Sequence, residues 1–479
     1  MIHDAIDLSF ARVFADVERI AGKLVELGIG PGDIVAVHVR KPVSHWMVTL
    51  GLMRVGAVSL SLTSNAGNEL AALADVAAVI CGPGEEGAFP ETMRRFAVGR
   101  DWLDRPRPTP SALPRPEEAN RTVGRLCFTS GTSGRPKAIM LDARRLGARL
   151  AGTARRSGIH PGSTLWCGLG PDTAYGFTAT IATWFEGGTV VLSAGGQGAF
   201  EQMRARGVNL VIASPASLQP LIRDAAAKGL PRIVGPAIVA GGRLSASFRD
   251  QIRDHVCSEV KVAYGSSEAG GVTLGKAQGL DNHPGQVGTV FPDVEVLTVD
   301  PDGAVLPPGA EGRLKIRSDS MAAGYFNDPA ATSQVFQDGW FLPGDIARIS
   351  ATGTLTLLGR TAQILNLGGV KIPVEEVENR VRDIAGVSDA CAVLIAGASA
   401  EAELNIVVVA SPDSAGEIGA SIRAALPHLP AFWLFTAHEI PRGSMGKVRK
   451  QVIVDAVAGA RAGPGGDGGA RRFGHLGKF

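Results

Sequence analysis

The segment Phe128-Thr-Ser-Gly-Thr-Ser-Gly-Arg-Pro-Lys137 has the side chains and the backbone freedom needed to hold a polyphosphate. It follows the apolar stretch from Val123 to Phe128 directly, and its candidate ligands are Thr129, Ser130, Gly131, Thr132, Ser133, Gly134 and Lys137. The hydroxyls and the lysine can donate to phosphate oxygens, and the glycines let backbone N–H groups approach an anion. No Gly-Lys-Ser/Thr follows the first glycine at the required spacing, which excludes a Walker loop. A Ser/Gly-rich loop alone is often a plain turn, but this order of residues favours a phosphate site.

Six further segments follow this loop along the chain. They are Ala240-Gly-Gly-Arg-Leu244, Tyr264-Gly-Ser-Ser-Glu268, the stretch from Gly312 to Thr332 with Gly324-Tyr325 and Asp328-Pro329, Asp338-Gly-Trp-Phe-Leu-Pro-Gly-Asp345, Gly359-Arg360, and Pro441-Arg-Gly-Ser-Met-Gly-Lys447. In this order they resemble the motifs of the AMP-forming adenylating enzymes, the superfamily of acyl-CoA synthetases, non-ribosomal peptide synthetase adenylation domains and beetle luciferase. The resemblance covers roughly Ser9 to Val457, which is nearly the whole chain.

The resemblance implies a binding site for the adenine and ribose of ATP. Tyr264 would stack on the adenine, Asp345 would accept both ribose hydroxyls, and Arg360 would add a further ribose contact. The residues implied beside Tyr264 are Gly241, Gly242, Arg243 and Gly265. The alternatives are that Tyr264 is a buried core aromatic and that Asp345, which follows a glycine, is a turn residue.

The resemblance also implies the groups that act on the phosphates. Glu268 would hold Mg²⁺ against them, and a carboxylate oxygen is the kind of hard ligand that magnesium prefers. Ser267 would add a phosphate contact. Lys447 would touch both the acid and the α-phosphate, and a fixed cation there would stabilise the charge that develops as the two anions join. A lone surface carboxylate and an exposed Gly-Lys turn are the alternatives for Glu268 and Lys447.

A second reaction is implied by the same resemblance, because family members rotate a small C-terminal domain so that a thiol can attack the acyl adenylate. Gly368 and Gly369 lie in the segment that would leave room for a pantetheine arm, although glycines after a short strand are otherwise simply a turn. The acyl adenylate is itself the activated species, so no Ser/His/Asp or Cys/His set is needed. We therefore assign no catalytic role to the histidines.

The acid is expected to bind between Thr173 and Ser266. Tyr175, Phe177, Ala240 and Ser266 resemble family positions around the acyl pocket, together with Trp184 and Pro215. Amino-acid adenylating domains usually place an aspartate near the substrate amine, but Asp172 follows Pro171 in a predicted turn. The pocket residues are otherwise apolar or small, which favours a carboxylic acid without an amine, either aliphatic or aromatic.

Three positions depart from the family pattern. Ala138 replaces a usual glycine in the phosphate loop, Pro343 replaces a usual threonine before Gly344-Asp345, and Ala362 occupies the hinge where Asp or Lys is common. None of them removes a group that we expect to bind phosphate directly. We expect them instead to affect the hinge motion of the C-terminal domain and the rate of the reaction.

The elements that must position these motifs alternate between helical and extended patterns, which predicts α/β layers. Apolar residues at helical spacing begin at Phe10, and a buried-type strand runs from Ile34 to Val39. The Pro-rich stretch from Asp104 to Arg121 is interpreted as a surface connection rather than a linker. We predict a large layered N-terminal α/β domain over 1–360, a small mobile C-terminal α+β lid domain over 361–457, and a disordered tail over 458–479.

The amino-acid composition limits the classes of partner and the compartment that we expect. Lys+Arg 48 against Asp+Glu 46 gives a net charge of +2, which offers no overall electrostatic reason to expect nucleic acid. The five scattered cysteines form no CxxC pair, and no apolar run is long enough for a membrane helix. These features favour a cytoplasmic protein with no membrane span.

The leading hypothesis is an AMP-forming acid–thiol ligase with ATP and Mg²⁺ as cofactors, a small carboxylic acid as substrate, and CoA as co-substrate. The first alternative is a free-standing adenylating enzyme that loads the thiol of a carrier protein. The second alternative is a nucleotide-binding relic without ligase activity, suggested by Pro343 and Ala362. The four residues most needed for the ligase reaction are all present, which argues against the relic: Lys137, Glu268, Asp345 and Lys447.

Overall fold

The structure is a computed structural model that describes residues 1–3, 6–63, 66–71, 73, 75–129, 137–192, 198–242, 244–277, 285–360, 364–367, 370–396, 402–427, 429, 431–442, 448–462 and 473–476. The chain divides into two compact units. The first comprises Met1–Leu297, Lys315–Pro343 and Ala351–Leu355, and the second comprises Thr298–Leu314, Gly344–Ser350 and Thr356–Phe479. The division therefore differs from a single boundary after residue 360, because two earlier segments belong to the second unit.

One sheet of the first unit carries the predicted phosphate loop. Its strand order is β6 (Arg95–Ala97), β5 (Val76–Cys81), β3 (Ile34–His38), β4 (Val58–Ser61), β7 (Gly124–Thr129) and β8 (Lys137–Asp142), parallel except for the antiparallel β7–β8 pair. The helices of this part are α1 (Phe10–Glu26), α2 (Pro42–Arg54), α3 (Ala66–Ala71) and α4 (Pro116–Thr122). Alternate strand residues pack on the two faces, Val35 and Val37 against α1 and α2, and Ala36 in the other core cluster with Leu70 of α3.

The helix predicted from Phe10 is confirmed as α1. Ser9 caps it by accepting a hydrogen bond from the backbone N–H of Arg12, and the chain leaves it at Gly28, where φ is 69°. Its apolar stripe, including Ile20 and Leu24, is buried in the core.

The Pro-rich stretch is a surface connection within the first unit, as predicted. The guanidinium of Arg19 donates to the carbonyl oxygen of Arg105 at 3.0 Å, and Arg105 also forms an ion pair with Glu26. Leu113 is buried in the same core cluster as α1. These contacts fix the connection to the helix that it crosses.

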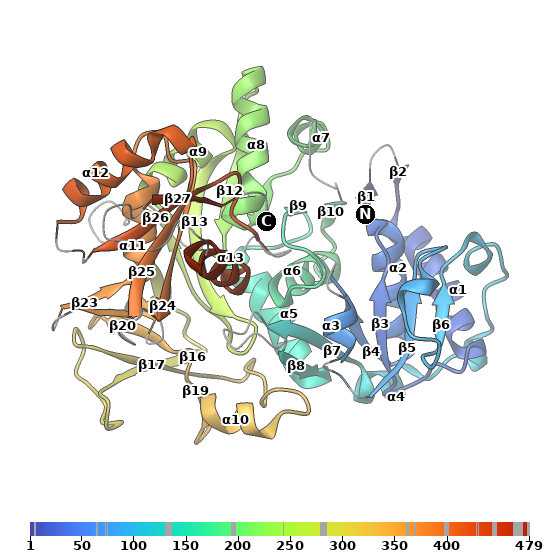
Figure 1. The fold of residues 1–479 in the computed structure, drawn as a ribbon. Helices are drawn as coiled ribbons and strands as arrows, with labels where there is room; N and C mark the ends of the chain where they lie inside the picture. The colour runs from blue at the N-terminus through green and yellow to red at the C-terminus, as the bar shows by residue number, and fades with distance from the viewer. Residues whose placement is uncertain are drawn as a thin grey trace. The chain divides into compact units, whose positions relative to one another are not determined.

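The other sheet of the first unit carries the predicted adenine and metal motifs (Figure 1). Its order is β15 (Gln286–Val290), β14 (Gly270–Lys276), β13 (Cys257–Ser266), β12 (Ile233–Val239), β11 (Leu210–Ala213), β9 (Thr164–Cys167), β10 (Thr189–Leu192), β1 (Ile2–His3) and β2 (Ile6–Asp7). The strands from β13 through β12, β11, β9 and β10 to β1 are parallel. The helices that accompany them are α5 (Ala143–Ser157), α6 (Ala174–Phe185), α7 (Ala199–Ala205), α8 (Pro215–Lys228) and α9 (Ala246–His255).

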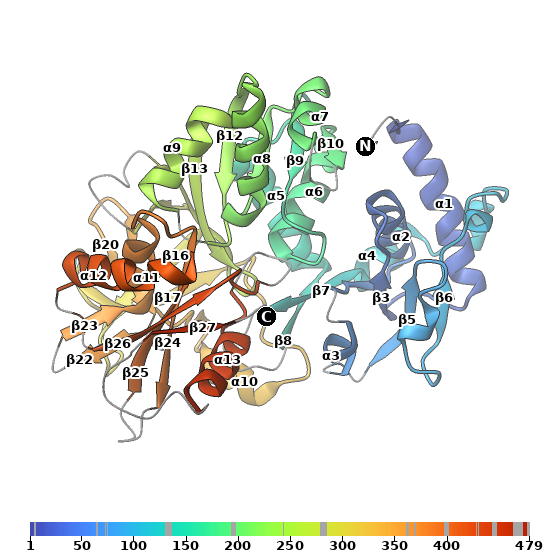
Figure 2. The same ribbon diagram turned by 45° about the horizontal axis from the view of Figure 1, so that its top comes forward.

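This parallel sheet is buried on both faces. Val211 and Val239 pack with the core residues of α7, α8 and α9, whereas Ile212 and Ile238 pack with α5 and α6. Figure 2 shows α8 and α9 beside β12 and β13. Helices on both faces explain why the strand sequences are almost continuously apolar.

The remaining strands of the first unit adjoin β17 (Glu311–Ser318). β18 (Phe336–Gln337) pairs with β19 (Trp340–Phe341), which pairs with the later part of β17 through Ile316 and Phe341, and α10 (Pro329–Val335) precedes them. Asp328 caps α10 by accepting from the N–H of Ala331, and Pro329 occupies the first turn. This short helix follows Tyr325, so its cap fixes the chain beside the site described below.

The second unit contains a four-stranded sheet in the order β24 (Asp389–Ala396), β25 (Ala402–Val409), β26 (Phe432–Ala437) and β27 (Phe473–Leu476). Its helices are α11 (Val374–Arg382), α12 (Ala415–Ala425) and α13 (Lys450–Ala462), and its other strands are β20 (Asp345–Ile349), the hairpin β22 (Ile364–Leu367) with β23 (Val370–Pro373), and parts of β16 (Val294–Val299), β17 and β21 (Thr354–Arg360). α11 and α12 pack in one core cluster, and α13 packs in the other.

The chain beyond Val457 differs from the predicted disordered tail. α13 continues to Ala462, and β27 pairs in parallel with β26 through Leu434 and Phe473. Leu476 is buried in the core cluster that contains α13. Because the tail is rich in glycine, sequence analysis did not identify β27, a short segment that forms the edge strand of the four-stranded sheet.

Two expectations from composition concern the whole chain. All five cysteines are free, as their spacing predicted. Within the residues that the structure describes, no helix combines the length and the apolar character needed to cross a membrane.

Candidate functional site

The predicted adenine segments leave the second sheet from two neighbouring parallel strands. β12 and β13 pair through Val239 and Val262, so the chain continues into Ala240–Gly242 from one strand and towards Tyr264 on the other. The N–H of Ala240 donates to the carbonyl of Ala213 at 3.0 Å, which holds the segment against the end of β11. Ligands of parallel α/β sheets bind outside the carboxyl ends of the strands, which is where these segments lie.

Two glycines of these segments have a steric reason to be glycine. A Cβ on Gly265 would lie 2.3 Å from the carbonyl oxygen of Gly270, where the β13–β14 pairing shifts register. Gly241 has φ 78°, a conformation that side chains rarely adopt. Tyr264 is half-buried in β13 and lies opposite Thr273 of β14.

The ends of the predicted phosphate loop are held together as the β7–β8 pair, with Thr129 opposite Lys137. The hydroxyl of Thr129 is buried and has no hydrogen-bond partner within the described residues. The unusual Ala138 is 3% exposed, packs in a core cluster, and accepts from the N–H of Phe326 at 2.6 Å.

Several predicted residues lie outside the described residues: Ser130, Gly131, Thr132, Ser133, Gly134, Arg243, Gly368, Gly369 and Lys447, together with Ala362 of the hinge. Their roles remain predictions. The described residues nevertheless include the flanks of each of these segments.

Lys137 and Glu268, which are far apart in the sequence, meet at Tyr325. The Tyr325 hydroxyl donates to Oε1 of Glu268 at 2.9 Å, and Nζ of Lys137 lies 5.1 Å from the centre of the Tyr325 ring. Glu268 is only 8% exposed. Burial, and then the negative charge of Glu268, raise the pKa of Tyr325, so the tyrosine is a hydrogen-bond donor. Sequence analysis noted Tyr325 only as part of a motif, because nothing in the spacing indicates that its hydroxyl reaches Glu268.

The backbone beneath Glu268 is fixed by a buried arginine. Nη2 of Arg149 donates to the carbonyl of Glu268 at 3.1 Å, and its Nε donates to the carbonyl of Ser320 at 2.8 Å. Burial lowers the pKa of Arg149 to about 10, which still leaves it charged at neutral pH. The hydroxyl of Ser266, predicted for the acyl pocket, accepts from the N–H of Ala269 at 3.0 Å and so stabilises the same turn.

The carboxylate of Glu268 fits a divalent cation. Tyr325 occupies Oε1, and no described residue donates a hydrogen bond to Oε2. An oxygen of this kind is a suitable ligand for Mg²⁺, which is usually bound by one or two carboxylates together with substrate phosphates. The described residues contain no group of three or more His, Cys, Asp or Glu side chains placed to hold a metal.

The predicted acyl positions lie on α6 and on the segments that end β12 and β13. Phe177 is completely buried, and its ring stacks on Trp46 with 5.9 Å between the ring centres. The Tyr175 hydroxyl lies 3.3 Å from the hydroxyl of Ser157. Phe177 is therefore a core residue in this structure, and its part in the acyl pocket stays a prediction.

A buried arginine lies against Phe177, and sequence analysis missed it. Arg125 of β7 is fully buried, lies over the Phe177 ring at 4.5 Å, and donates to the hydroxyls of Ser59 and Ser61 at 3.2 and 2.7 Å. It also donates to the carbonyl of Pro171 at 2.5 Å. A charged residue inside an otherwise apolar strand was the available signal.

His45 joins this network, because its Nε2 lies 2.7 Å from the Ser61 hydroxyl and its Nδ1 lies 3.2 Å from the carbonyl of Val39. Burial, and then the charge of Arg125, lower the pKa of His45 from 6.5 to about 3. The unfolded chain therefore binds a proton that the folded chain does not bind between these values. The His45 contribution to stability is complete above pH 6.5 and is lost as the pH falls towards 3.

We expect acidification below pH 6.5 to lower the free energy of unfolding through His45 by up to about 1.4 kcal/mol per pH unit. The measurement is the thermal midpoint of the wild type and of His45→Gln, from pH 6.5 down to about pH 4. The wild type should lose more stability over this range than the variant. Equal pH slopes for the two proteins would contradict the assignment.

The two predicted ribose residues lie together in the second unit. Nε of Arg360 donates to Oδ1 of Asp345 at 3.0 Å, and the Asp345 side chain is 8% exposed whereas that of Arg360 is 41% exposed. The pair joins the start of β20 to the end of β21. An ionised carboxylate only accepts hydrogen bonds, which suits binding to hydroxyls.

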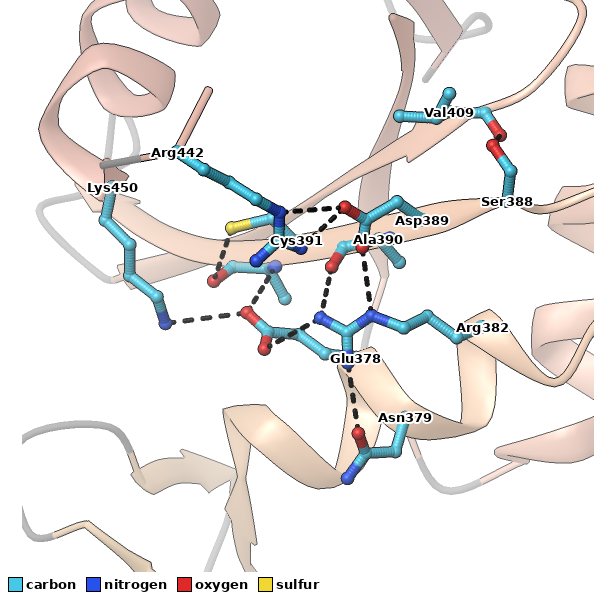
Figure 3. Close-up of polar contacts among 11 residues, drawn as sticks. Glu378, Asn379, Arg382, Ser388, Asp389, Ala390, Cys391, Val409, Arg442 and Lys450 are labelled. Atoms are coloured by element: carbon cyan, nitrogen blue, oxygen red, sulfur yellow. Dashed lines mark hydrogen bonds and ion pairs between the residues drawn. The ribbon is translucent and has the colours of Figure 1, made fainter. Parts of the chain in front are cut away.

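The flanks of the segment that contains Lys447 are anchored within the second unit (Figure 3). On one flank, Arg442 donates from Nη2 to Oδ2 of Asp389 at 2.5 Å, and Asp389 also accepts from Arg382 at 3.1 Å. On the other flank, Nζ of Lys450 lies 3.5 Å from Oε1 of Glu378. Arg442 and Val448 are paired as a β-bridge, so the two flanks lie side by side.

The chain is similar in sequence to one family of enzymes and to characterised proteins. The family model described as "AMP-binding enzyme" matches residues 1–326. A salicylyl-CoA synthase / salicylate adenylyltransferase from a Streptomyces species is 26% identical, with 94% of this chain and 89% of that protein covered. A feruloyl-CoA synthase from an Amycolatopsis species is 29% identical, with 82% of this chain and 81% of that protein covered.

Solved structures share the fold. O-succinylbenzoate coenzyme A synthetase from Bacillus subtilis, in complex with ATP and a magnesium ion, matches with a TM-score of 0.81 at 20% identity, over 94% of this chain and 96% of that chain. The predicted α/β fold, with a large N-terminal and a small C-terminal part, is confirmed.

Proposed function

The chain belongs to the family of AMP-binding enzymes, and we propose that it joins a carboxylic acid to a thiol in two steps, with the residues described above as its site. In the first step ATP and the acid form an acyl adenylate and pyrophosphate. In the second step the thiol of CoA takes the acyl group and AMP is released. The observation that carries this proposal is the meeting of Lys137 and Glu268 at Tyr325.

Adenylation requires that an oxygen of the acid attack the α-phosphorus while pyrophosphate leaves. The β7–β8 loop, from Thr129 to Lys137, would hold the phosphates, and Glu268 would hold Mg²⁺ through Oε2. Magnesium when bound neutralises charge on the phosphate oxygens. Lys447 would contact both the attacking acid and the α-phosphate and stabilise their combined charge.

The nucleoside would be held by the predicted adenine and ribose residues. Tyr264 offers a half-buried ring for the adenine, beside Gly241 and Gly242. Asp345, held by Arg360, would accept the ribose hydroxyls. Gly368 and Gly369 would line the path of the pantetheine arm in the thiol step, after Lys447 has withdrawn.

We infer that the acid carries no amine and that aromatic acids are the first class to test. Two of the predicted acyl positions, Phe177 and the partly buried Trp184, form an aromatic cluster with Trp46. The two relatives above are named for salicylate and ferulate, which are both aromatic. Arg125 would set the shape of the pocket through Phe177 and Pro171.

Acid-dependent exchange between ATP and pyrophosphate tests the first step across aromatic, aliphatic and amino acids. AMP release with and without CoA then tests the second step. Exchange with one class of acid and CoA-dependent AMP release would support the ligase and name its substrate class. Exchange that does not respond to CoA would favour a carrier-protein thiol as the acceptor. ATP binding without exchange for any acid would contradict the proposal and favour the relic.

The contacts that anchor the flanks of the Lys447 segment lead to the prediction that they position Lys447 for adenylation. Asp389→Asn should lower the adenylation rate by about 10-fold, which corresponds to about 1.4 kcal/mol, because it removes the charge that holds Arg442. Transfer from a supplied acyl adenylate to CoA should change less. The measurement is pyrophosphate exchange beside CoA-dependent release of AMP from that adenylate.

Glu311→Gln is the matched control, because Glu311 forms an exposed ion pair with Arg348 in the same unit. Loss of an exposed pair should have little effect. If Asp389→Asn slowed both half-reactions equally, or neither, the ion pair would not position the lysine for adenylation.

A further inference from the structure

Tyr325 is held rigidly by both neighbouring segments. Its backbone N–H donates to the hydroxyl of Thr332 at 2.9 Å, and it forms a β-bridge with Ile139 of β8. The next residue, Phe326, donates its N–H to the carbonyl of Ala138 at 2.6 Å. Tyr325 is thus fixed to the strand that begins with Lys137.

The Tyr325 hydroxyl determines which oxygen of Glu268 faces a ligand. An ionised carboxylate can only accept hydrogen bonds, so the tyrosine must donate. It donates to Oε1, and no described residue donates to Oε2. A partner that fixes the plane of a carboxylate in this way is the usual companion of a metal ligand.

The Tyr325 ring determines where the lysine lies. Nζ of Lys137 is 5.1 Å from the ring centre, within the range of a cation–π contact. Lys137 and Glu268, both of which the structure describes, form no ion pair with one another although each contacts Tyr325. Direct pairing would neutralise the two charges, and neither would then be available to a phosphate or to a cation.

We propose that Tyr325 is a positioning residue for adenylation, which orients the Glu268 carboxylate through its hydroxyl and keeps Lys137 apart from that carboxylate with its ring. The inference rests on the proposed function, because it gives Glu268 a cation and Lys137 a phosphate. It assigns separate tasks to two parts of one side chain. Two substitutions can therefore test them separately.

Tyr325→Phe removes the hydroxyl and retains the ring. The Mg²⁺ concentration for half-maximal pyrophosphate exchange should rise by about 10-fold, the lower end of the usual effect of losing a metal ligand's partner. The KM for ATP at saturating Mg²⁺ should stay near that of the wild type. Tyr325→Leu removes both groups, so it should raise the Mg²⁺ midpoint and also the KM for ATP.

A direct binding measurement complements the kinetics. Mn²⁺ replaces Mg²⁺ as a probe, and its free concentration is followed by electron paramagnetic resonance in the presence of a non-hydrolysable ATP analogue. Tyr325→Phe should weaken Mn²⁺ binding by about 10-fold. Unchanged Mn²⁺ binding and an unchanged Mg²⁺ midpoint would overturn the proposal.

Two further variants separate positioning from a merely structural effect. Thr49→Val removes another buried hydroxyl, which donates to the carbonyl of His45 at 2.9 Å, and should leave the Mg²⁺ midpoint unchanged. In a Glu268→Gln background, Tyr325→Phe should cause no further shift in the midpoint. An equal shift in both backgrounds would show that the hydroxyl does not act through Glu268.

The wild type distinguishes failure of this inference from failure of the proposed function. If the wild type shows no Mg²⁺-dependent exchange with any acid, the proposed function itself fails. If the wild type shows such exchange and Tyr325→Phe matches it, only the role of Tyr325 is refuted. Thermal unfolding of each variant identifies any loss of activity that comes from the fold.

Discussion

Replacing Lys447 by alanine should lower the rate of adenylate formation by about 100-fold or more, which is the usual effect of removing one donor that stabilises transition-state charge. The acid and the α-phosphate are both anionic, and their negative charges approach most closely in the transition state. A cation that touches both at that point stabilises the transition state more than either bound reactant. The measurement is the rate of acid-dependent pyrophosphate exchange at saturating ATP and acid.

The thiol step provides the internal comparison for Lys447→Ala. When the acyl adenylate is supplied, its transfer to CoA should be much less affected, because the carboxylate charge has already left with pyrophosphate and the lysine no longer has two anions to bring together. Lys228→Ala is the control, since Lys228 lies on α8 and pairs with Glu201 and Asp224. Full adenylation activity in Lys447→Ala would remove that residue from the mechanism.

Features determined by local sequence were predictable. Ser9 and the apolar spacing from Phe10 define α1, and the run from Ile34 gives β3 because a strand buried on both faces must be apolar throughout. The motif that ends with Glu268 could be identified because its resemblance to the family includes the order of the motifs as well as their residues. The carboxyl ends of β12 and β13 then bring two motifs to one edge.

Contacts that depend on the meeting of distant segments were not predictable. Neither Lys137 nor Glu268 carries a local sign that Tyr325 lies between them, since β8, β13 and the chain before α10 come together only in the tertiary fold. The contacts of Arg125 were also not predictable from the sequence. One charged residue in a strand indicates a buried polar network, but not that its partners are Ser59 and Ser61.

The predicted boundary after residue 360 differs from the division into compact units for a related reason. Sequence analysis placed the start of the small domain directly after Arg360, because a continuous stretch of chain is the simplest unit. The second unit also takes Thr298–Leu314 and Gly344–Ser350, so Asp345 and Arg360 belong to it as a bonded pair. Strands added from an earlier part of the chain leave no compositional break.

Glu268→Gln should raise the Mg²⁺ requirement of adenylation by at least about 10-fold, because an amide oxygen without a formal charge is a much weaker ligand for a hard cation. The substitution preserves volume, and the Gln oxygen can still accept from Tyr325, so the surrounding turn should remain folded. Arg149 holds that turn through the carbonyl of residue 268, which the substitution leaves in place.

The decisive comparison is between the Mg²⁺ titration and the limiting rate. A ligand that only binds the cation should be compensated by high Mg²⁺, so Glu268→Gln should recover much of its exchange rate at saturation. Glu295→Gln is the control, because Glu295 forms an exposed ion pair with Arg317. A Mg²⁺ titration identical to that of the wild type would rule against Glu268 as the metal ligand. The proposed role of the Tyr325 hydroxyl is to orient the Glu268 carboxylate for the cation. The same result would therefore also refute that role.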